Sequence, residues 1–202
     1  MAKRLELQLG LGIFKMGRVM EIPAHYKLVY CAEEIAAAVS AIGKEVTSWA
    51  REVYEKTGQD ILGIPVLRGG IFFFSDLVRK IECSVRIAPV KTWGYESSTN
   101  QLLPGGVKVN LIDIAARDRH VLLIDDICDT GRTLKAVVQA LLDAGACEVR
   151  SAVLIKRVLT DETYEPDYVG FRFEGADWLV GYGMDDADRW RNLSSICVIK
   201  KE

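Results

Sequence analysis

Three carboxylates and a hydroxyl-rich turn stand close together in the middle of the chain. Asp125 and Asp126 follow the apolar run 121–124, and Asp129 comes three residues later. The turn 129–133 (Asp-Thr-Gly-Arg-Thr) then leads into an apolar segment with helical spacing. Carboxylates accept hydrogen bonds from vicinal sugar hydroxyls and are ligands that Mg²⁺ prefers, while a glycine-containing helix start offers backbone N–H groups to phosphate. The pattern therefore indicates a site for a phosphorylated sugar and a divalent metal.

A simpler interpretation of this segment is a plain turn in which Thr133 caps the helix. That interpretation suits an isolated Asp-x-Gly, but the complete string of strand, acidic residues, turn and helix favours a binding site. Gly131 would let the backbone approach a phosphate with no side chain in the way. Consecutive strand residues point to opposite faces, so we expect Asp125 and Asp126 to lie at the end of their strand, where the pleat relaxes.

Hydrophobic periodicity predicts the elements that position this turn. Helices are expected at 32–54, 71–81 and 134–143, the last closed by Gly145. Strands are expected at 61–67, 83–89, 121–124, 149–155, 168–173 and 178–182, with a hairpin arm at 107–114 and a polar loop at 91–103. Alternating strands and helices favour an α/β fold with a mainly parallel sheet, in which ligands bind beyond the carboxyl ends of the strands.

Composition narrows the class of protein. A chain of 202 residues fits one domain, and a net charge of -2 gives no global field that would recruit nucleic acid. The five cysteines are odd in number and scattered, which argues against a zinc site and against a disulfide framework. The apolar run 9–14 is too short and too rich in glycine to span a membrane. We expect a cytoplasmic protein that binds neither membrane nor nucleic acid.

The string 125–133 resembles the 5-phosphoribosyl-1-pyrophosphate (PRPP) motif of type I phosphoribosyltransferases. Four further segments, 66–77, 166–171, 180–185 and 191–193, resemble the hypoxanthine-guanine phosphoribosyltransferases in order and spacing. The resemblance covers roughly residues 30–200. It implies the type I phosphoribosyltransferase fold as a single domain 1–202. Its core would span about 32–157, and a small hood subdomain would come from about 1–31 and 158–202.

The resemblance also implies roles for particular residues. Ribose and its phosphate would be held by Asp125, Asp126, Thr130, Gly131, Arg132 and Thr133. Pyrophosphate would be bound by Arg68, Gly69 and Arg191, with a non-proline cis peptide bond in the turn 68–69. The base would be bound by Lys156 at O6, by stacking on Trp178, and by carbonyls around Leu179 and Asp185. Mg²⁺ would be held by Asp185 and, partly through water or ribose hydroxyls, by Asp125 and Asp126.

Each of these residues taken alone has a simpler explanation. The explanations are a solvated lysine for Lys156, a core aromatic for Trp178, a turn former for Asp185 and a surface ion pair for Arg191. Their joint order and spacing favour function. The family usually has lysine where Arg68 stands, and Ser-Tyr where the lid has Thr92 and Trp93. Arginine keeps the charge of lysine with a different geometry. Threonine keeps the hydroxyl of serine, whereas tryptophan loses the phenolic oxygen.

The expected activity is purine salvage, in which the phosphoribosyl group moves from PRPP to N9 of hypoxanthine or guanine and pyrophosphate leaves. Asp129 would be the catalytic residue, managing the proton at purine N7. Two alternatives remain: a xanthine-preferring transferase, and a regulator that senses PRPP with little catalysis. The resemblance further suggests a homodimer or homotetramer.

Overall fold

The computed structural model describes residues 22–88, 90–93, 108–110, 114–160 and 162–199. Three helices lie within these ranges: α1 (Ala32–Thr57), α2 (Ile71–Val78) and α3 (Arg132–Asp143). The strands are β1 (Tyr26–Tyr30), β2 (Ile61–Leu67), β3 (Val85–Ile87), β4 (Val90–Trp93), β5 (Lys108–Asn110), β6 (His120–Cys128), β7 (Glu148–Val158), β8 (Tyr168–Glu174), β9 (Leu179–Val180) and β10 (Ile196–Ile199). None of these helices is both long and apolar enough to cross a membrane.

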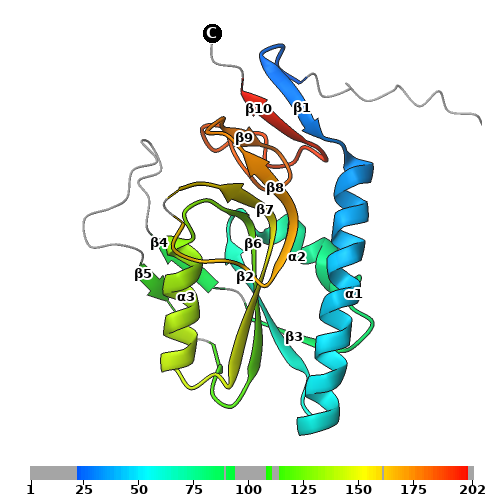
Figure 1. The fold of residues 1–202 in the computed structure, drawn as a ribbon, viewed down its shortest axis with the longest axis vertical. Helices are drawn as coiled ribbons and strands as arrows, with labels where there is room; N and C mark the ends of the chain where they lie inside the picture. The colour runs from blue at the N-terminus through cyan, green and yellow to red at the C-terminus, as the bar shows by residue number, and fades with distance from the viewer. Residues whose placement is uncertain (1–21, 89, 94–107, 111–113, 161, 200–202) are drawn as a thin grey trace, which may run out of the picture.

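A seven-stranded sheet forms the centre of the molecule, in the order β5-β4-β2-β6-β7-β8 with β3 also paired to β2. All of its pairings are parallel except that of β4 with β5. Side chains alternate between the faces, so that Leu122 and Ile124 of β6 pack with α1 and α2, whereas Val121 and Leu123 pack with α3. Figure 1 shows α3 on one side of the sheet and α1 on the other. The predicted α/β class with a mainly parallel sheet is confirmed.

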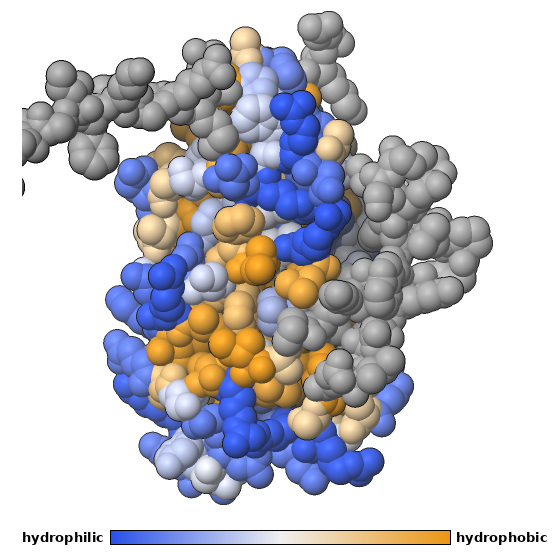
Figure 2. Space-filling view, turned by 180° about the vertical axis from the view of Figure 1, so that it is seen from behind, coloured by the Kyte–Doolittle hydropathy of each residue, from blue (hydrophilic) through white to orange (hydrophobic). Residues whose placement is uncertain are grey.

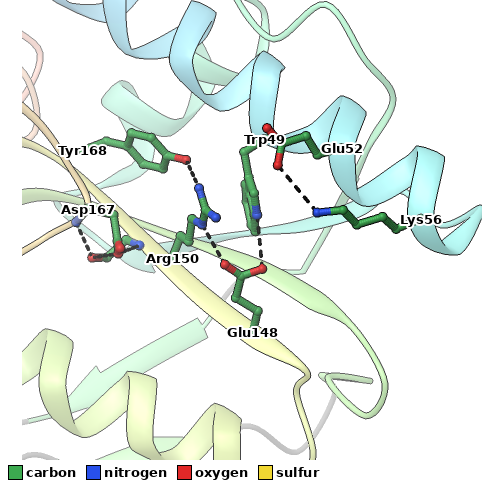
Figure 3. Close-up of polar contacts among 8 residues, drawn as sticks. Trp49, Glu52, Lys56, Glu148, Arg150, Asp167 and Tyr168 are labelled. Carbon is green, nitrogen blue, oxygen red and sulfur yellow. Dashed lines mark hydrogen bonds and ion pairs between the residues drawn. The ribbon is translucent and has the colours of Figure 1, made fainter.

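The helix α1 is also tied to the sheet by polar contacts (Figure 3). The indole N–H of Trp49 donates to Glu148 at 3.2 Å, and the same carboxylate accepts from Arg150 at 2.7 Å. Arg150 also donates to the Tyr168 hydroxyl at 3.1 Å, and its guanidinium lies 4.8 Å from the centre of the Trp49 ring. These contacts join α1, β7 and β8 at the end of the sheet from which β7 begins.

A second, three-stranded sheet has the order β1-β10-β9 and stands above the carboxyl ends of the large sheet in Figure 1. It joins the segment before α1 to the C-terminal segment, with Tyr26 opposite Ile199. Strands β1 and β10 are not among the predicted elements. The predicted hood assigned 158–202 to this part, but β8 (Tyr168–Glu174) pairs in parallel with β7 in the large sheet. The core therefore continues past residue 157.

Several predicted boundaries change in the structure. The strand predicted at 121–124 runs as β6 from His120 to Cys128, because its pairing with β7 continues to Cys128 opposite Lys156. Helix α3 begins at Arg132 rather than 134. Of the predicted strand 83–89, the described residues 83–88 contain only the short β3. In the predicted lid, Thr92 and Trp93 lie in the backbone of β4, and 94–103 lie outside the described residues.

Candidate active site

Two acidic side chains on β6 line one cavity at the carboxyl end of the sheet. Asp125 and Asp126 are each 7% exposed and border a cavity of about 190 Å³. They lie within β6 rather than at its end, so the expected relaxation of the pleat does not explain their convergence. Backbone contacts orient them instead: the Asp126 N–H donates to Asp125 Oδ1 at 3.0 Å, and the Ile127 N–H donates to Asp126 Oδ1 at 2.9 Å.

Burial acts strongly on the charge of this pair. Loss of water raises the pKa of Asp125 well above its usual range, and the neighbouring negative charge of Asp126 raises it further. Loss of water also raises the pKa of Asp126, although backbone hydrogen bonds and the nearby positive charge of Arg191 oppose that rise. A pair of buried carboxylates is best stabilised by hydrogen-bond donors or a cation, which is what sugar hydroxyls and a metal ion supply.

The turn after β6 supplies the other wall of this cavity. Thr130, Gly131, Arg132 and Thr133 all line it, and Gly131 precedes α3 with φ +82°. Thr133 lies inside the first turn of α3, so the interpretation of this residue as a helix cap does not hold. A Cβ atom on Gly131 would come within 2.7 Å of the Tyr164 Cβ, and only glycine fits both the conformation and the space. The helix start and the acidic pair thus face one cavity, as the sequence predicts.

A second cavity of about 210 Å³ adjoins the first. It is lined by Gly69, Asp126, Ile127, Asp129, Arg157, Trp178, Leu179, Met184, Asp185 and Arg191. The first four of these residues also line the cavity beside α3, so the two cavities share a wall. We name them the phosphate-side cavity, beside α3, and the base-side cavity, beside Trp178. Asp129 lines both cavities. A residue in this position could act on a bond that forms between a ligand in one cavity and a ligand in the other.

Lys156 is not among the described residues that line the two cavities. Its side chain is fully buried, and its Nζ lies 3.4 Å from the Asp129 carbonyl and 3.4 Å from the Glu162 carboxylate. Arg157, which the sequence analysis missed, borders the base-side cavity instead. Consecutive side chains of a strand point to opposite faces, so Lys156 and Arg157 cannot both face the base-side cavity. This alternation was the signal in the sequence that could have identified Arg157.

Gly69, in the turn 68–69 that is expected to bind pyrophosphate, lines both cavities. A Cβ atom there would lie 2.1 Å from Asp126 Oδ2, so the backbone passes directly against that carboxylate. The non-proline cis peptide bond joins Leu67 and Arg68, one residue before the predicted turn 68–69. Arg68 lines neither cavity and contacts both Asp188 oxygens, at 2.9 and 3.2 Å.

The C-terminal wall of the base-side cavity is held together by Asp185. Its side chain lies 2.6 Å from the Arg191 guanidinium, which also donates to the Gly183 carbonyl at 2.7 Å. Its backbone carbonyl accepts the indole N–H of Trp178 at 2.6 Å. Trp178 is 41% exposed, so its ring is available at the edge of the cavity rather than buried in the core.

A magnesium ion held entirely by protein side chains does not fit this site. Within the described ranges, no three side chains of histidine, cysteine, aspartate or glutamate come together as a metal cage. The buried pair Asp125 and Asp126 does fit an ion that keeps water and substrate oxygens among its ligands, as Mg²⁺ commonly does.

Comparison with known proteins agrees with this geometry. Residues 34–187 match the family model described as phosphoribosyl transferase domain. The chain is 34% identical to the hypoxanthine-guanine phosphoribosyltransferase of Mycobacterium tuberculosis over 82% of this chain and 81% of that protein. It is 31% identical to the enzyme of the same name from Lactococcus lactis over 87% of this chain and 92% of that one.

Solved structures show the same fold. A hypoxanthine phosphoribosyltransferase from Staphylococcus aureus superposes with a TM-score of 0.75 at 24% identity, covering 86% of this chain and 91% of that one. The chain belongs to the phosphoribosyl transferase family and, within it, to the hypoxanthine-guanine phosphoribosyltransferases. The predicted family, fold and enzyme class, a purine salvage transferase, are confirmed.

Proposed function

We propose that this protein transfers the phosphoribosyl group of PRPP to N9 of hypoxanthine or guanine, giving the nucleoside 5′-monophosphate and pyrophosphate. The observation that carries the proposal is the pair of cavities with a common wall at Asp126 and Asp129. The phosphate-side cavity combines buried carboxylates with a helix start, which suits ribose and its phosphate. The base-side cavity combines an aromatic ring with backbone carbonyls, which suits a flat heterocycle.

The donor would be held by three groups of contacts. Asp125 and Asp126 accept hydrogen bonds from the ribose hydroxyls, and the turn 130–133 binds the 5′-phosphate with backbone N–H groups and hydroxyls. Arg191 and the Gly69 N–H bind the pyrophosphate oxygens. Mg²⁺, when bound near Asp125, Asp126 and Asp185, would offset the negative charge of the leaving diphosphate.

Departure of pyrophosphate leaves positive charge on the ribose ring, and the attacking N9 comes from the base-side cavity. Asp129 lines both cavities, so its carboxylate reaches the base while the turn that carries it holds the phosphate. We assign it the proton at N7, either as a general base or by stabilising N7–H. Thr92 and Trp93 would belong to the lid that excludes water from the reacting carbon.

Selection among bases would depend on O6. Lys156 offers only donors, so a 6-oxopurine is accepted and the 6-amino group of adenine is rejected. Its Nζ lies 3.4 Å from the Asp129 carbonyl, and thus next to a residue of the base-side cavity. Contact with O6 requires the ammonium group to turn from Glu162 toward that cavity.

Replacing Trp178 by phenylalanine is expected to favour guanine. The Asp185 carbonyl, which we assign to the 2-amino group of guanine, already accepts the Trp178 indole N–H at 2.6 Å. Because a carbonyl oxygen has two lone pairs, the guanine amine would share this acceptor with the indole N–H, whereas hypoxanthine has no amine at this position. Phenylalanine keeps a stacking ring and leaves the carbonyl to guanine alone, so the ratio of kcat/KM for guanine to that for hypoxanthine should rise about twofold to threefold, the lower end of the effect of one hydrogen bond. Steady-state kinetics with both bases measure the ratio, and a lower or unchanged ratio would contradict this assignment.

Pyrophosphate release with PRPP, Mg²⁺ and each of four bases tests the proposed function. We expect turnover with hypoxanthine and guanine, little with xanthine, and none with adenine. Preference for xanthine would favour the alternative transferase. Absence of turnover with every base would favour a PRPP-sensing regulator, although a net charge of -2 gives such a protein no general attraction to nucleic acid.

We further propose a cytoplasmic enzyme that assembles as a homodimer or homotetramer. The rear view in Figure 2 supports self-association, because apolar side chains gather in the middle of that surface. Exposed apolar residues include Ile71 and Phe72 of α2 and Ile87 of β3.

A further inference from the structure

Arg157 connects the two parts of the chain that meet at the base-side cavity. Its Nε lies 2.5 Å from Asp129 Oδ1. Its NH1 donates to the carbonyls of Gly175 at 2.7 Å and Asp177 at 3.1 Å. One guanidinium therefore holds the carboxylate after β6 and the backbone that leads directly into Trp178.

The surroundings of Arg157 keep its guanidinium in one place. Its side chain is only 9% exposed, and its Cζ lies 5.5 Å from the centre of the Phe173 ring. The strand β7 fixes its backbone, since Arg157 pairs with Phe173 of β8. The planar guanidinium holds several N–H donors in one geometry. Because two of its contacts are to backbone carbonyls, its position relative to Asp129 is fixed.

Asp129, by contrast, is not fixed by burial. Its side chain is 49% exposed, and a half-exposed carboxylate without a partner samples several rotamers. Contact with Arg157 holds Oδ1, so Oδ2 is the oxygen through which this carboxylate would meet purine N7. Much of the rate increase that a catalytic group provides comes from its being held in the reactive orientation before the substrate reacts.

We propose that Arg157 is a positioning residue that sets the orientation of Asp129 and of the segment before Trp178, and thereby aligns the purine with the ribose. The inference rests on the proposed function, because it concerns the same reaction. Arg157 borders the base-side cavity but not the phosphate-side cavity, and its proposed role acts through Asp129 and this segment rather than through PRPP. Its loss should therefore reduce kcat and weaken base binding while leaving PRPP binding unchanged.

A double-mutant cycle tests this role. Arg157→Gln, Asp129→Asn and the double variant are assayed with PRPP, Mg²⁺ and hypoxanthine. Arg157→Gln should lower kcat by roughly tenfold to a hundredfold with KM for PRPP within about twofold, as expected when orientation is lost. In the Asp129→Asn background the same change should lower kcat by less than about threefold, since residues that act as a unit are not additive. Arg157→Lys, which keeps the charge, should fall between wild type and Arg157→Gln.

Arg150→Gln is the matched control. Arg150 also lies on β7, pairs with a carboxylate at 2.7 Å and contacts an aromatic ring, but it borders neither cavity. Its replacement should leave kcat within about twofold of wild type. An equal loss of kcat in Arg157→Gln and Arg150→Gln would overturn the positioning role. The same follows if Arg157→Gln lowers kcat equally in the wild-type and Asp129→Asn backgrounds.

Amide hydrogen exchange separates this inference from the proposed function, because it needs no turnover. Peptides that cover 175–178 should exchange faster in Arg157→Gln than in wild type, and should be unchanged in Arg150→Gln. Unchanged exchange in Arg157→Gln would contradict the anchoring of this segment. Faster exchange in Arg157→Gln, combined with a wild-type protein that turns over no base, would contradict the proposed function alone.

Discussion

Replacement of Asp129 by asparagine is expected to lower kcat by about a hundredfold to ten-thousandfold, the range that general acid–base groups contribute. Asparagine keeps the size of the side chain and an oxygen that can still accept from Arg157. The variant therefore removes the charge at N7 while changing the geometry little. Binding of PRPP with Mg²⁺, measured by calorimetry, should stay within about twofold, because Asp125 and Asp126 and the turn 130–133 carry that affinity.

The exposed carboxylate of Asp143, at the end of α3, provides the control. It accepts a hydrogen bond from Gln139 at 2.8 Å and lines neither cavity, so Asp143→Asn should leave kcat unchanged. Near-normal turnover of Asp129→Asn would remove Asp129 from the mechanism.

The second large effect is expected from Gly131→Ala. At φ +82° an alanine is strained by roughly 1–2 kcal/mol, and its Cβ would meet the Tyr164 Cβ at 2.7 Å and the Tyr164 backbone N and O at 3.0 Å. Relief of that contact must move either the turn or the segment that covers it. We expect a loss of roughly 2–4 kcal/mol in the free energy of unfolding, combining strain and overpacking, together with a rise in KM for PRPP of at least about tenfold.

Gly58→Ala isolates the contribution of the backbone alone. Gly58 closes α1 with φ +69°, but a Cβ there would meet nothing within 4 Å. This variant should lose only about 1–2 kcal/mol of stability and keep its KM for PRPP. Chemical denaturation and PRPP saturation curves measure both quantities. Equal losses of stability in the two variants, with PRPP binding intact in each, would show that Gly131 is not shaped around the phosphate.

Much of the core could be predicted from periodicity because it depends on local patterns. The strand 61–67 and the start of α1 at Ala32 lie where the apolar spacing places them. The end of β6 could not be placed in this way, since two carboxylates interrupt the apolar run although pairing with β7 continues. Strands β1 and β10 are short and pair across almost the whole chain, Tyr26 with Ile199, so no local pattern announces them.

The candidate site was predicted best where one short motif contains it. Asp125, Asp126, Asp129 and the turn 130–133 line one cavity, as their spacing indicates. The residues on the base side come from separate elements, and their orientation depends on tertiary contacts. Sequence resemblance therefore favoured Lys156 without revealing that its neighbour Arg157 borders the cavity and contacts Asp129.

Product analysis of one reaction tests the proposed transfer of the phosphoribosyl group. Wild-type protein is incubated with PRPP, Mg²⁺ and hypoxanthine, and phosphorus NMR with mass spectrometry follows the products. We expect equal amounts of pyrophosphate and of a hypoxanthine nucleotide whose ribose is attached at N9, with no loss of PRPP when the base is omitted. Consumption of PRPP that does not depend on the base, or no nucleotide at all, would contradict the assignment of the two adjoining cavities to donor and acceptor.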